Sequence, residues 1–198
     1  MRSVKDMEDI AYYQKFGNIP DDQLERVKFI LGRRSKDLKF NQMIQLKAKK
    51  IRGIKKKSIR FTMWKVIRPS ARPRANTTAG FVNMYVPRAR ENGLWFEQFA
   101  KEHNLPVIDT PCELNMRIYE KTPSSFNITQ TVLAECGLIR PWKRTGDFDN
   151  YAKGIADCIQ HGMLKDDCLV IKSTQELLYS IKPHADIELI YLSKFPEI

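Results

Sequence analysis

One ten-residue stretch, PCELNMRIYE at positions 111–120, most constrains what this chain can fold into. Its apolar and polar side chains alternate from Cys112 to Ile118, which is the two-residue period of a β-strand with one buried face. Further strands are predicted where β-branched and aromatic residues gather, in IRFTMWKVIR (59–68), CLVIKS (168–173) and ADIELIYL (185–192). The chain therefore builds a sheet that needs a cover on one face.

Helical patterns lie between these strands. RENGLWFEQFAKEH (90–103) is amphipathic, and TPSSFNITQTVLAECG (122–137) holds a helix that a serine caps and Gly137 ends. RPSARPRANTTAG (68–80) is typical of a loop. With 198 residues, of which 42% are hydrophobic, the chain is long enough for one globular domain plus an arm. We expect an α/β (α+β) fold, a mixed β-sheet flanked by helices, over residues 59–198.

Several classes of protein are disfavoured. No run of 18 or more apolar residues exists, and the N-terminal stretch has no apolar region typical of a signal peptide. The four cysteines are far apart and without a C-x-x-C pair, and the three histidines are scattered, so neither a zinc site nor a Ser-His-Asp triad is predicted. We expect a cytoplasmic protein with no membrane partner.

The formal net charge of +11 is concentrated in one segment. Residues 1–25 hold three basic and six acidic side chains, a net of −3. Residues 26–60 hold fourteen basic and one acidic, a net of +13, whereas residues 61–198 hold seventeen and sixteen, a net of +1. This asymmetry predicts a basic arm, residues 1–58, on a nearly neutral body.

The arm has the pattern of two helices. Asp22 to Glu25 resembles a capping box, an apolar stripe follows, and Gly32 ends the first helix. Ser35 is a candidate cap for the second. Lysines at this density favour binding to the phosphate backbone of nucleic acid; the candidates are Lys49, Lys50, Lys55, Lys56 and Lys57. A solvated helix pair is the alternative, and a membrane-surface helix is less consistent with the few large apolar residues.

Acidic residues gather in GDFDNYAKGIADCIQHGMLKDD (146–167), which holds five aspartates. In an extended segment Asp147 and Asp149 point to the same side. Asp149-Asn150 is suited to cap a helix over YAKGIADCIQH (151–161), whose buried stripe is Tyr151, Ile155 and Ile159.

Two further aspartates, Asp166 and Asp167, precede the strand that is expected to start near Cys168. A strand-loop-helix-turn-strand path would bring both ends of this unit together. Two carboxylates about 4 Å apart repel by roughly 4 kcal/mol at an effective dielectric near 20, so either one of them stays protonated or a cation lies between them. Oxygen ligands without His or Cys favour Mg²⁺ or Mn²⁺ over zinc. The alternative is a simple helix cap and a solvated turn.

The ordered set of these residues resembles the RusA family of Holliday-junction resolvases, which are phage-type endodeoxyribonucleases. The matching positions are Asp147, Asp149, Asn150, Lys153, Asp157, Asp166 and Asp167. RPSARPR (68–74), YVPR (85–88) and KTPSS (121–125) are similar to other segments of the family, so the resemblance spans about residues 59–193. The arm lies outside it.

The resemblance implies a homodimer that resolves four-way DNA junctions by paired, Mg²⁺-dependent phosphodiester hydrolysis. It implies that Asp147, Asp149 and Asp167 bind the metal, that Asp166 shares this task, and that Lys153 lies beside the scissile phosphate. Arg72, Arg74, Arg88 and Arg90 would then hold the DNA backbone together with the arm. Two alternatives stay open: a nuclease for forks or flaps, and a DNA-binding regulator or packaging accessory with a vestigial site.

Overall fold

The chain divides into two compact units, Met1–Lys55 with Pro196–Ile198, and Lys56–Phe195. The computed structural model describes residues 21–32, 37–64, 74–78, 81–85, 89–141 and 148–196. No helix within these ranges combines the length and the apolar content that crossing a bilayer requires.

The first unit holds helices α2 (Asp21–Leu31) and α3 (Leu38–Arg52). Gly32, predicted to end the first helix, follows α2 with a φ of +48°, a left-handed conformation that glycine adopts readily. The predicted cap of the second helix is wrong. The cap is Asp37, whose carboxylate accepts a hydrogen bond of 3.1 Å from the backbone N–H of Phe40, and Ser35 lies outside the described residues.

The second unit holds a mixed four-stranded sheet, so the predicted fold class is confirmed. Its elements are β1 (Lys56–Met63), β2 (Arg74–Thr78), β3 (Phe81–Tyr85), α4 (Ala89–Glu102), β4 (Cys112–Lys121), α5 (Ile128–Glu135), α6 (Phe148–Gln160), the 3₁₀ turn η2 (Asp167–Leu169), β5 (Val170–Ser180) and β6 (His184–Leu192). The strand order is β1-β6-β4-β5, with β4 parallel to β5 and the other neighbours antiparallel. Strands β2 and β3 form a separate antiparallel pair.

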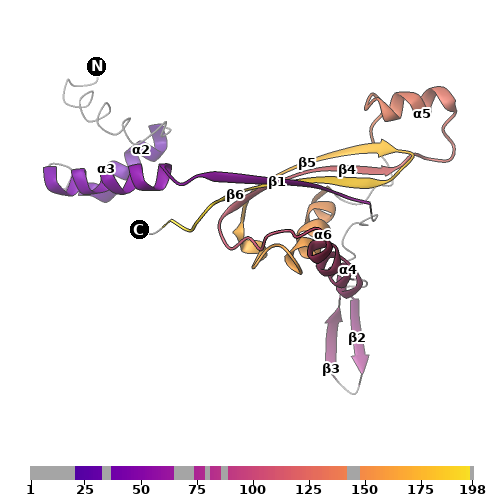
Figure 1. The fold of residues 1–198 in the computed structure, drawn as a ribbon, viewed down its shortest axis with the longest axis horizontal. Helices are drawn as coiled ribbons and strands as arrows, with labels where there is room; N and C mark the ends of the chain where they lie inside the picture. The colour runs from indigo at the N-terminus through magenta and orange to yellow at the C-terminus, as the bar shows by residue number, and fades with distance from the viewer. Residues whose placement is uncertain are drawn as a thin grey trace. The chain divides into compact units, whose positions relative to one another are not determined.

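The core lies on one face of this sheet. The alternation that predicted β4 is confirmed, because Cys112, Leu114, Met116 and Ile118 are all at most 5% exposed. Helices α4 and α6 cover this face side by side (Figure 1). They bury Phe96, Ile155 and other apolar side chains against the strands.

The other face of the sheet is polar. Glu113, Asn115 and Arg117, the residues between the buried positions of β4, line this second face with the partners that the neighbouring strands supply. The sheet is therefore covered on its apolar side, as the alternation of β4 requires.

Four expectations about element boundaries need correction. Strand β1 begins at Lys56, so Lys56 and Lys57 are strand residues rather than the end of the helical arm. Part of the predicted loop at 68–80 is strand β2, which pairs with β3. The cap of α5 is Asn127 and not a serine, because Asn127 and Gln130 exchange hydrogen bonds of 2.8 and 3.0 Å in a capping box. Gly137, with a φ of +72°, follows this helix as predicted.

The fourth correction concerns the acidic segment. Helix α6 begins at Phe148, so Asp149 lies in its first turn rather than at its cap. Strand β5 begins at Val170, because residues 167–169 form the turn η2. The predicted strand 185–192 is confirmed as β6.

Substitution of a core residue in the central strand β6 should destabilise the fold strongly. Leu189 is 0% exposed, and we expect Leu189→Ala to lower the free energy of unfolding by about 2–5 kcal/mol, since it removes buried apolar atoms and leaves a cavity. Ile171→Ala on β5, where the side chain is 69% exposed, is the matched control and should change the stability by less than about 1 kcal/mol. Urea unfolding followed by circular dichroism measures both, and equal losses would contradict the assigned core.

Candidate active site

Helix α6 supplies one half of the acidic site. Its buried face is the predicted stripe, since Tyr151, Ile155 and Ile159 are 3%, 1% and 0% exposed. Asp149, Lys153 and Asp157 follow one another in four-residue steps along the same helix, so they share another face. Lys153 is exposed and Asp157 is half-buried.

The segment after α6 is fixed in place before it reaches the second pair of aspartates. Met163 and Leu164 are 0% and 2% exposed. The backbone N–H of Ile108 donates to the carbonyl of Met163 over 2.7 Å, and the N–H of Lys165 donates to the carbonyl of Ile108 over 3.0 Å. Asp166 and Asp167 therefore follow a buried, doubly hydrogen-bonded anchor rather than a free turn.

Asp166 and Asp167 differ in their environment. One oxygen of Asp166 accepts a hydrogen bond of 3.0 Å from the backbone N–H of Cys168, which caps η2 and lowers the pKa of Asp166. A hydrogen bond to Asp166 raises the pKa of the Cys168 thiol. Asp167 is exposed, so its carboxylate is accessible to a ligand.

The two halves meet at Asp157. Burial raises the pKa of Asp157, and the negative charge of Asp167 raises it further, whereas Lys153 and His161 act in the opposite direction. Asp167 must therefore lie close enough to Asp157 to repel it, consistent with the contact between α6 and η2. Lys153 and Asp167, two of the predicted catalytic residues, therefore both act on the carboxyl group of Asp157.

The raised pKa of Asp157 has a consequence for stability. The folded protein binds a proton at Asp157 more tightly than the unfolded chain does. The contribution of Asp157 to the free energy of unfolding therefore falls as the pH rises from the usual aspartate range through the raised pKa. Asp157→Asn should therefore raise the melting temperature at neutral pH in the absence of divalent metal, by a few degrees at most (about 2–4 °C per kcal/mol). The gain should vanish below about pH 3, where both states are protonated. A melting temperature of Asp157→Asn below that of the wild type at neutral pH would contradict the proposed burial of Asp157 and its repulsion by Asp167.

His161 is a neighbour of the site that the sequence analysis missed. Its charge lowers the pKa of Asp157 and also contributes to the lowered pKa of Glu97 on α4, which is due mainly to Lys101. The imidazole packs on Gly93 so closely that a Cβ at this position would lie 2.3 Å from ring atom Cδ2. The sequence spacing could have identified His161, because it continues the four-residue steps from Lys153 and Asp157.

The remaining acidic residues of the predicted set are described in part or not at all. Asp147 lies outside the described residues, and the backbone of Asp149 lies in the first turn of α6. Among the side chains that the structure describes, no three His, Cys, Asp or Glu residues form a group that could hold a metal ion. Metal binding by the full set is therefore still a prediction.

The candidate DNA-binding lysines fall in two places. Lys49 and Lys50 are exposed in the last turn of α3, and Lys55 is exposed just after it. Lys57 is an exposed residue of β1. The Nζ of Lys56 lies 3.2 Å from a carboxylate oxygen of Glu113 on β4.

The candidate arginines are described less fully. The backbone of Arg74 begins β2, and the backbone of Arg90 lies in the first turn of α4. Arg72 and Arg88 lie outside the described residues. Their contacts with DNA are still predictions.

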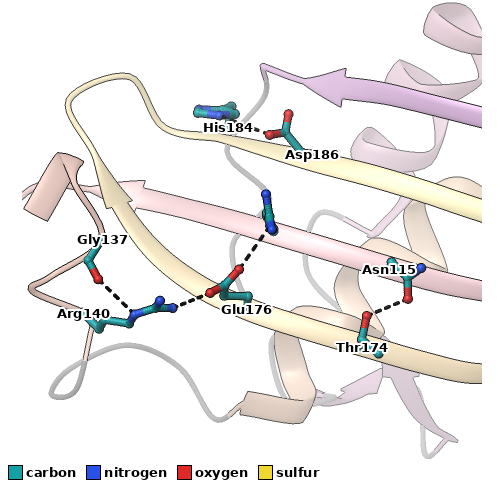
Figure 2. A network of polar contacts seen from close by, with 8 residues as sticks. Asn115, Gly137, Arg140, Thr174, Glu176, His184 and Asp186 are labelled. Carbon is teal, nitrogen blue, oxygen red and sulfur yellow. Dashed lines mark hydrogen bonds and ion pairs between the residues drawn. The ribbon is translucent and has the colours of Figure 1, made fainter.

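The polar face of the sheet carries a network that the sequence analysis did not predict (Figure 2). Arg117 and Arg140 bind the two carboxylate oxygens of Glu176 at 3.1 and 2.6 Å. The hydrogen bond from Arg140 is the main cause of the lowered pKa of Glu176. Lys56 and Lys172 bind Glu113 in the same manner, each at 3.2 Å.

A hollow of about 790 Å³ lies over the middle of this polar face. In its lining Arg60 donates to Glu188 over 2.7 Å and Thr62 donates to Asp186 over 2.6 Å. The acidic side chains in these pairs are therefore bonded to donors, and the ion pairs made by the exposed side chains of Arg60, Lys56 and Lys172 each contribute little to stability.

The comparisons with known proteins agree with the resemblance found in the sequence. The sequence pattern of the family described as Endodeoxyribonuclease RusA matches residues 66–190. A protein of Bacillus subtilis (strain 168), the uncharacterized protein YqaN, is 30% identical over 136 residues, which cover 65% of this chain and 93% of that protein. The chain belongs to the RusA family of endodeoxyribonucleases.

Proposed function

We propose that this chain is a Mg²⁺-dependent endodeoxyribonuclease that resolves Holliday junctions by paired phosphodiester hydrolysis. The observation that carries the proposal is the approach of Asp167 to Asp157, beside Lys153 on α6. The order of these residues in the chain and membership of the RusA family both support it.

The residues fit a hard divalent cation. The half-buried carboxyl of Asp157 and the exposed carboxylate of Asp167 repel each other, and a cation relieves such repulsion. The donors predicted for the site, Asp147, Asp149, Asp166 and Asp167, are all carboxylates, which suits Mg²⁺ and also Mn²⁺. When bound, such an ion supplies an activated water and neutralises charge that develops on the phosphate.

The side chains of α6 and η2 have separate roles in this proposal. In this proposal Asp149 on α6 and Asp167 in η2 hold the ion. Asp166 contributes less, because one of its oxygens is already bound to the N–H of Cys168. Lys153, exposed on the same face of α6, stabilises the negative charge of the phosphate.

The chain also carries cations to hold the DNA backbone. Residues 26–60 have a net charge of +13, and Lys49, Lys50 and Lys55 are exposed at the end of α3. On the body, Arg72, Arg74, Arg88 and Arg90 are the proposed contacts. These cations attract a polyanion toward a site whose own carboxylates repel it.

Paired cuts require two active sites, and a two-fold dimer is the simplest arrangement that provides them. We expect light scattering of the full chain at micromolar concentration to give about twice the 23.1 kDa mass of one chain. A protein that stays monomeric on junction DNA would contradict junction resolution and favour a nuclease that nicks one strand.

A panel of DNA shapes tests the proposed substrate. Four-way junctions, replication forks, flaps and linear duplexes of the same sequences are incubated with the purified chain and Mg²⁺, and the cut positions are mapped on both strands. We expect symmetric cuts in the four-way junction and little cleavage of the duplex. Faster cleavage of forks or flaps would assign the chain to another branched substrate.

A further inference from the structure

Three aromatic rings form a column at one end of the polar sheet face. The rings of Tyr119 and His184 stack at 4.1 Å with an interplanar angle of 11°, and the ring of Trp64 lies 4.9 Å from that of His184 at 34°. Tyr119 and His184 are direct cross-strand partners in β4 and β6. Trp64 directly follows Met63, which pairs with Ala185, so the three residues continue one row across the sheet.

The middle ring of the column is held in a fixed position. The Nδ1 atom of His184 donates a hydrogen bond of 2.7 Å to the carbonyl of Lys182, and its Nε2 lies 3.9 Å from a carboxylate oxygen of Asp186. Figure 2 shows His184 and Asp186 next to each other on β6. Asp186 in turn accepts a hydrogen bond from Thr62, two residues before Trp64. The column is therefore ordered before any ligand binds.

The outermost ring is exposed to solvent. His184 has a side-chain exposure of only 16%, whereas Trp64 is 64% exposed. A tryptophan that only stabilised the fold would bury most of its large apolar surface. Within the described part of the chain, the tilted contact with His184 is the one ring contact of Trp64. An indole surface thus stays available at the end of a preformed stack.

We propose that Trp64 is a platform on which an unpaired base of the DNA substrate stacks. This inference rests on the proposed function, since base stacking is interrupted where the helices of a branched DNA meet. Exposed aromatic rings next to cations bind unpaired bases irrespective of sequence, because each base has a π-face. Cations are present: Arg117 is 66% exposed two residues before Tyr119, and Lys182 is exposed two residues before His184.

The test measures binding by the full chain in EDTA, so that no cleavage occurs. The probes are a duplex with a bulge of unpaired thymines and the same duplex fully paired. Trp64→Ala should weaken binding of the bulged probe by about 5- to 100-fold, and binding of the paired probe by less than about twofold. The slope of log affinity against log salt should not change, because stacking releases no counterions.

Two further substitutions separate ring stacking from apolar bulk. Trp64→Phe should keep most of the affinity for the bulge, whereas Trp64→Leu should lose as much as Trp64→Ala. If circular dichroism shows that Trp64→Ala is unfolded, the comparison of Trp64→Phe with Trp64→Leu tests the platform instead. Phe195→Ala is the matched control, since Phe195 is an aromatic residue 59% exposed and outside the column, and it should bind both probes like the wild type.

The outcomes separate this inference from the proposed function. Equal binding of the bulged probe by the wild type and by Trp64→Ala or Trp64→Leu overturns the platform, whether or not the chain cleaves DNA. Selective loss of binding to the bulge supports the platform, even if the chain cleaves no junction and the proposed nuclease function fails.

Discussion

Asp167→Asn should reduce the cleavage of four-way junctions by orders of magnitude while the protein stays folded. The substitution removes a charged oxygen ligand from a site suited to a hard cation. Asp167 is exposed in the short turn η2, so the loss of its charge should change the melting temperature little. Single-turnover cleavage with Mg²⁺ measures the expected loss of activity, and calorimetric titration with Mg²⁺ measures the expected loss of metal affinity.

The same variant gives a readout that does not depend on activity. Because the charge of Asp167 raises the pKa of Asp157, Asp167→Asn should lower the pKa of Asp157 toward its usual value. Carboxyl NMR titration without metal measures this change. A wild-type pKa at Asp157 would mean that the two side chains do not interact.

Two matched variants make the loss of cleavage specific. Glu102→Gln removes an exposed carboxylate at the end of α4 and should leave the cleavage rate unchanged. Lys153→Ala should lose cleavage with little effect on Mg²⁺ affinity, because a lysine binds phosphate and not the cation. If Asp167→Asn binds Mg²⁺ and cleaves at the wild-type rate, Asp167 is not part of the active site.

Deletion of the basic arm should weaken DNA binding at every sequence and flatten its dependence on salt. Each phosphate contact contributes about 0.9 to the slope of log affinity against log salt, so the loss of the two candidate contacts at Lys49 and Lys50 would lower the slope by about 1.8. The deletion should remove residues 1–54. A deletion to residue 58 would also remove the start of β1, including Lys56, which pairs with Leu192 and binds Glu113.

A shorter deletion is the matched control for the arm. Residues 1–32 hold five basic and six acidic side chains, a net of −1, whereas residues 33–55 hold nine basic and one acidic, a net of +8. Deleting only residues 1–32 should therefore leave the salt slope nearly unchanged. Equal slopes for the full chain and for the 1–54 deletion would show that the arm does not contact phosphate.

Local patterns predicted those parts of the fold that depend on neighbouring residues. The alternation at Cys112, Leu114 and Met116 gave the buried face of β4, since a strand that packs on one side repeats every two residues. The cap of α5 was misplaced even though Asn127 and Gln130 have the spacing of a capping box. Ser124 and Ser125, which precede them, are also good capping residues, and the choice between them depends on the path of the loop.

The features that were missed depend on pairing between distant strands. Glu113 is bound by Lys56 and Lys172, which lie 57 and 59 residues away. The register of β1, β6, β4 and β5 brings these side chains together, and no local pattern contains it. Strand β2 was taken for a loop for the same reason, because its residues form a strand only by pairing with β3.

The candidate site also has one part that local sequence patterns predict and one part that depends on contacts between distant segments. The four-residue steps from Asp149 to Lys153 and Asp157 are visible in the sequence alone. In a helix this spacing places the three residues on one face, here of α6. The approach of Asp167 depends on the turn at residues 161–165, which is hydrogen-bonded to Ile108 more than fifty residues earlier in the chain. The members of the set are therefore recognisable in the sequence, whereas their proximity depends on the fold.

Cleavage of a four-way junction by the purified full chain, with Mg²⁺ and with EDTA, tests the proposed function most directly. We predict paired, symmetric cuts with Mg²⁺, none with EDTA, and none with Mg²⁺ when Asp167 is replaced by Asn. Absence of cleavage with Mg²⁺ or Mn²⁺ under conditions where the junction is bound would contradict the proposal, and so would equal cleavage with EDTA.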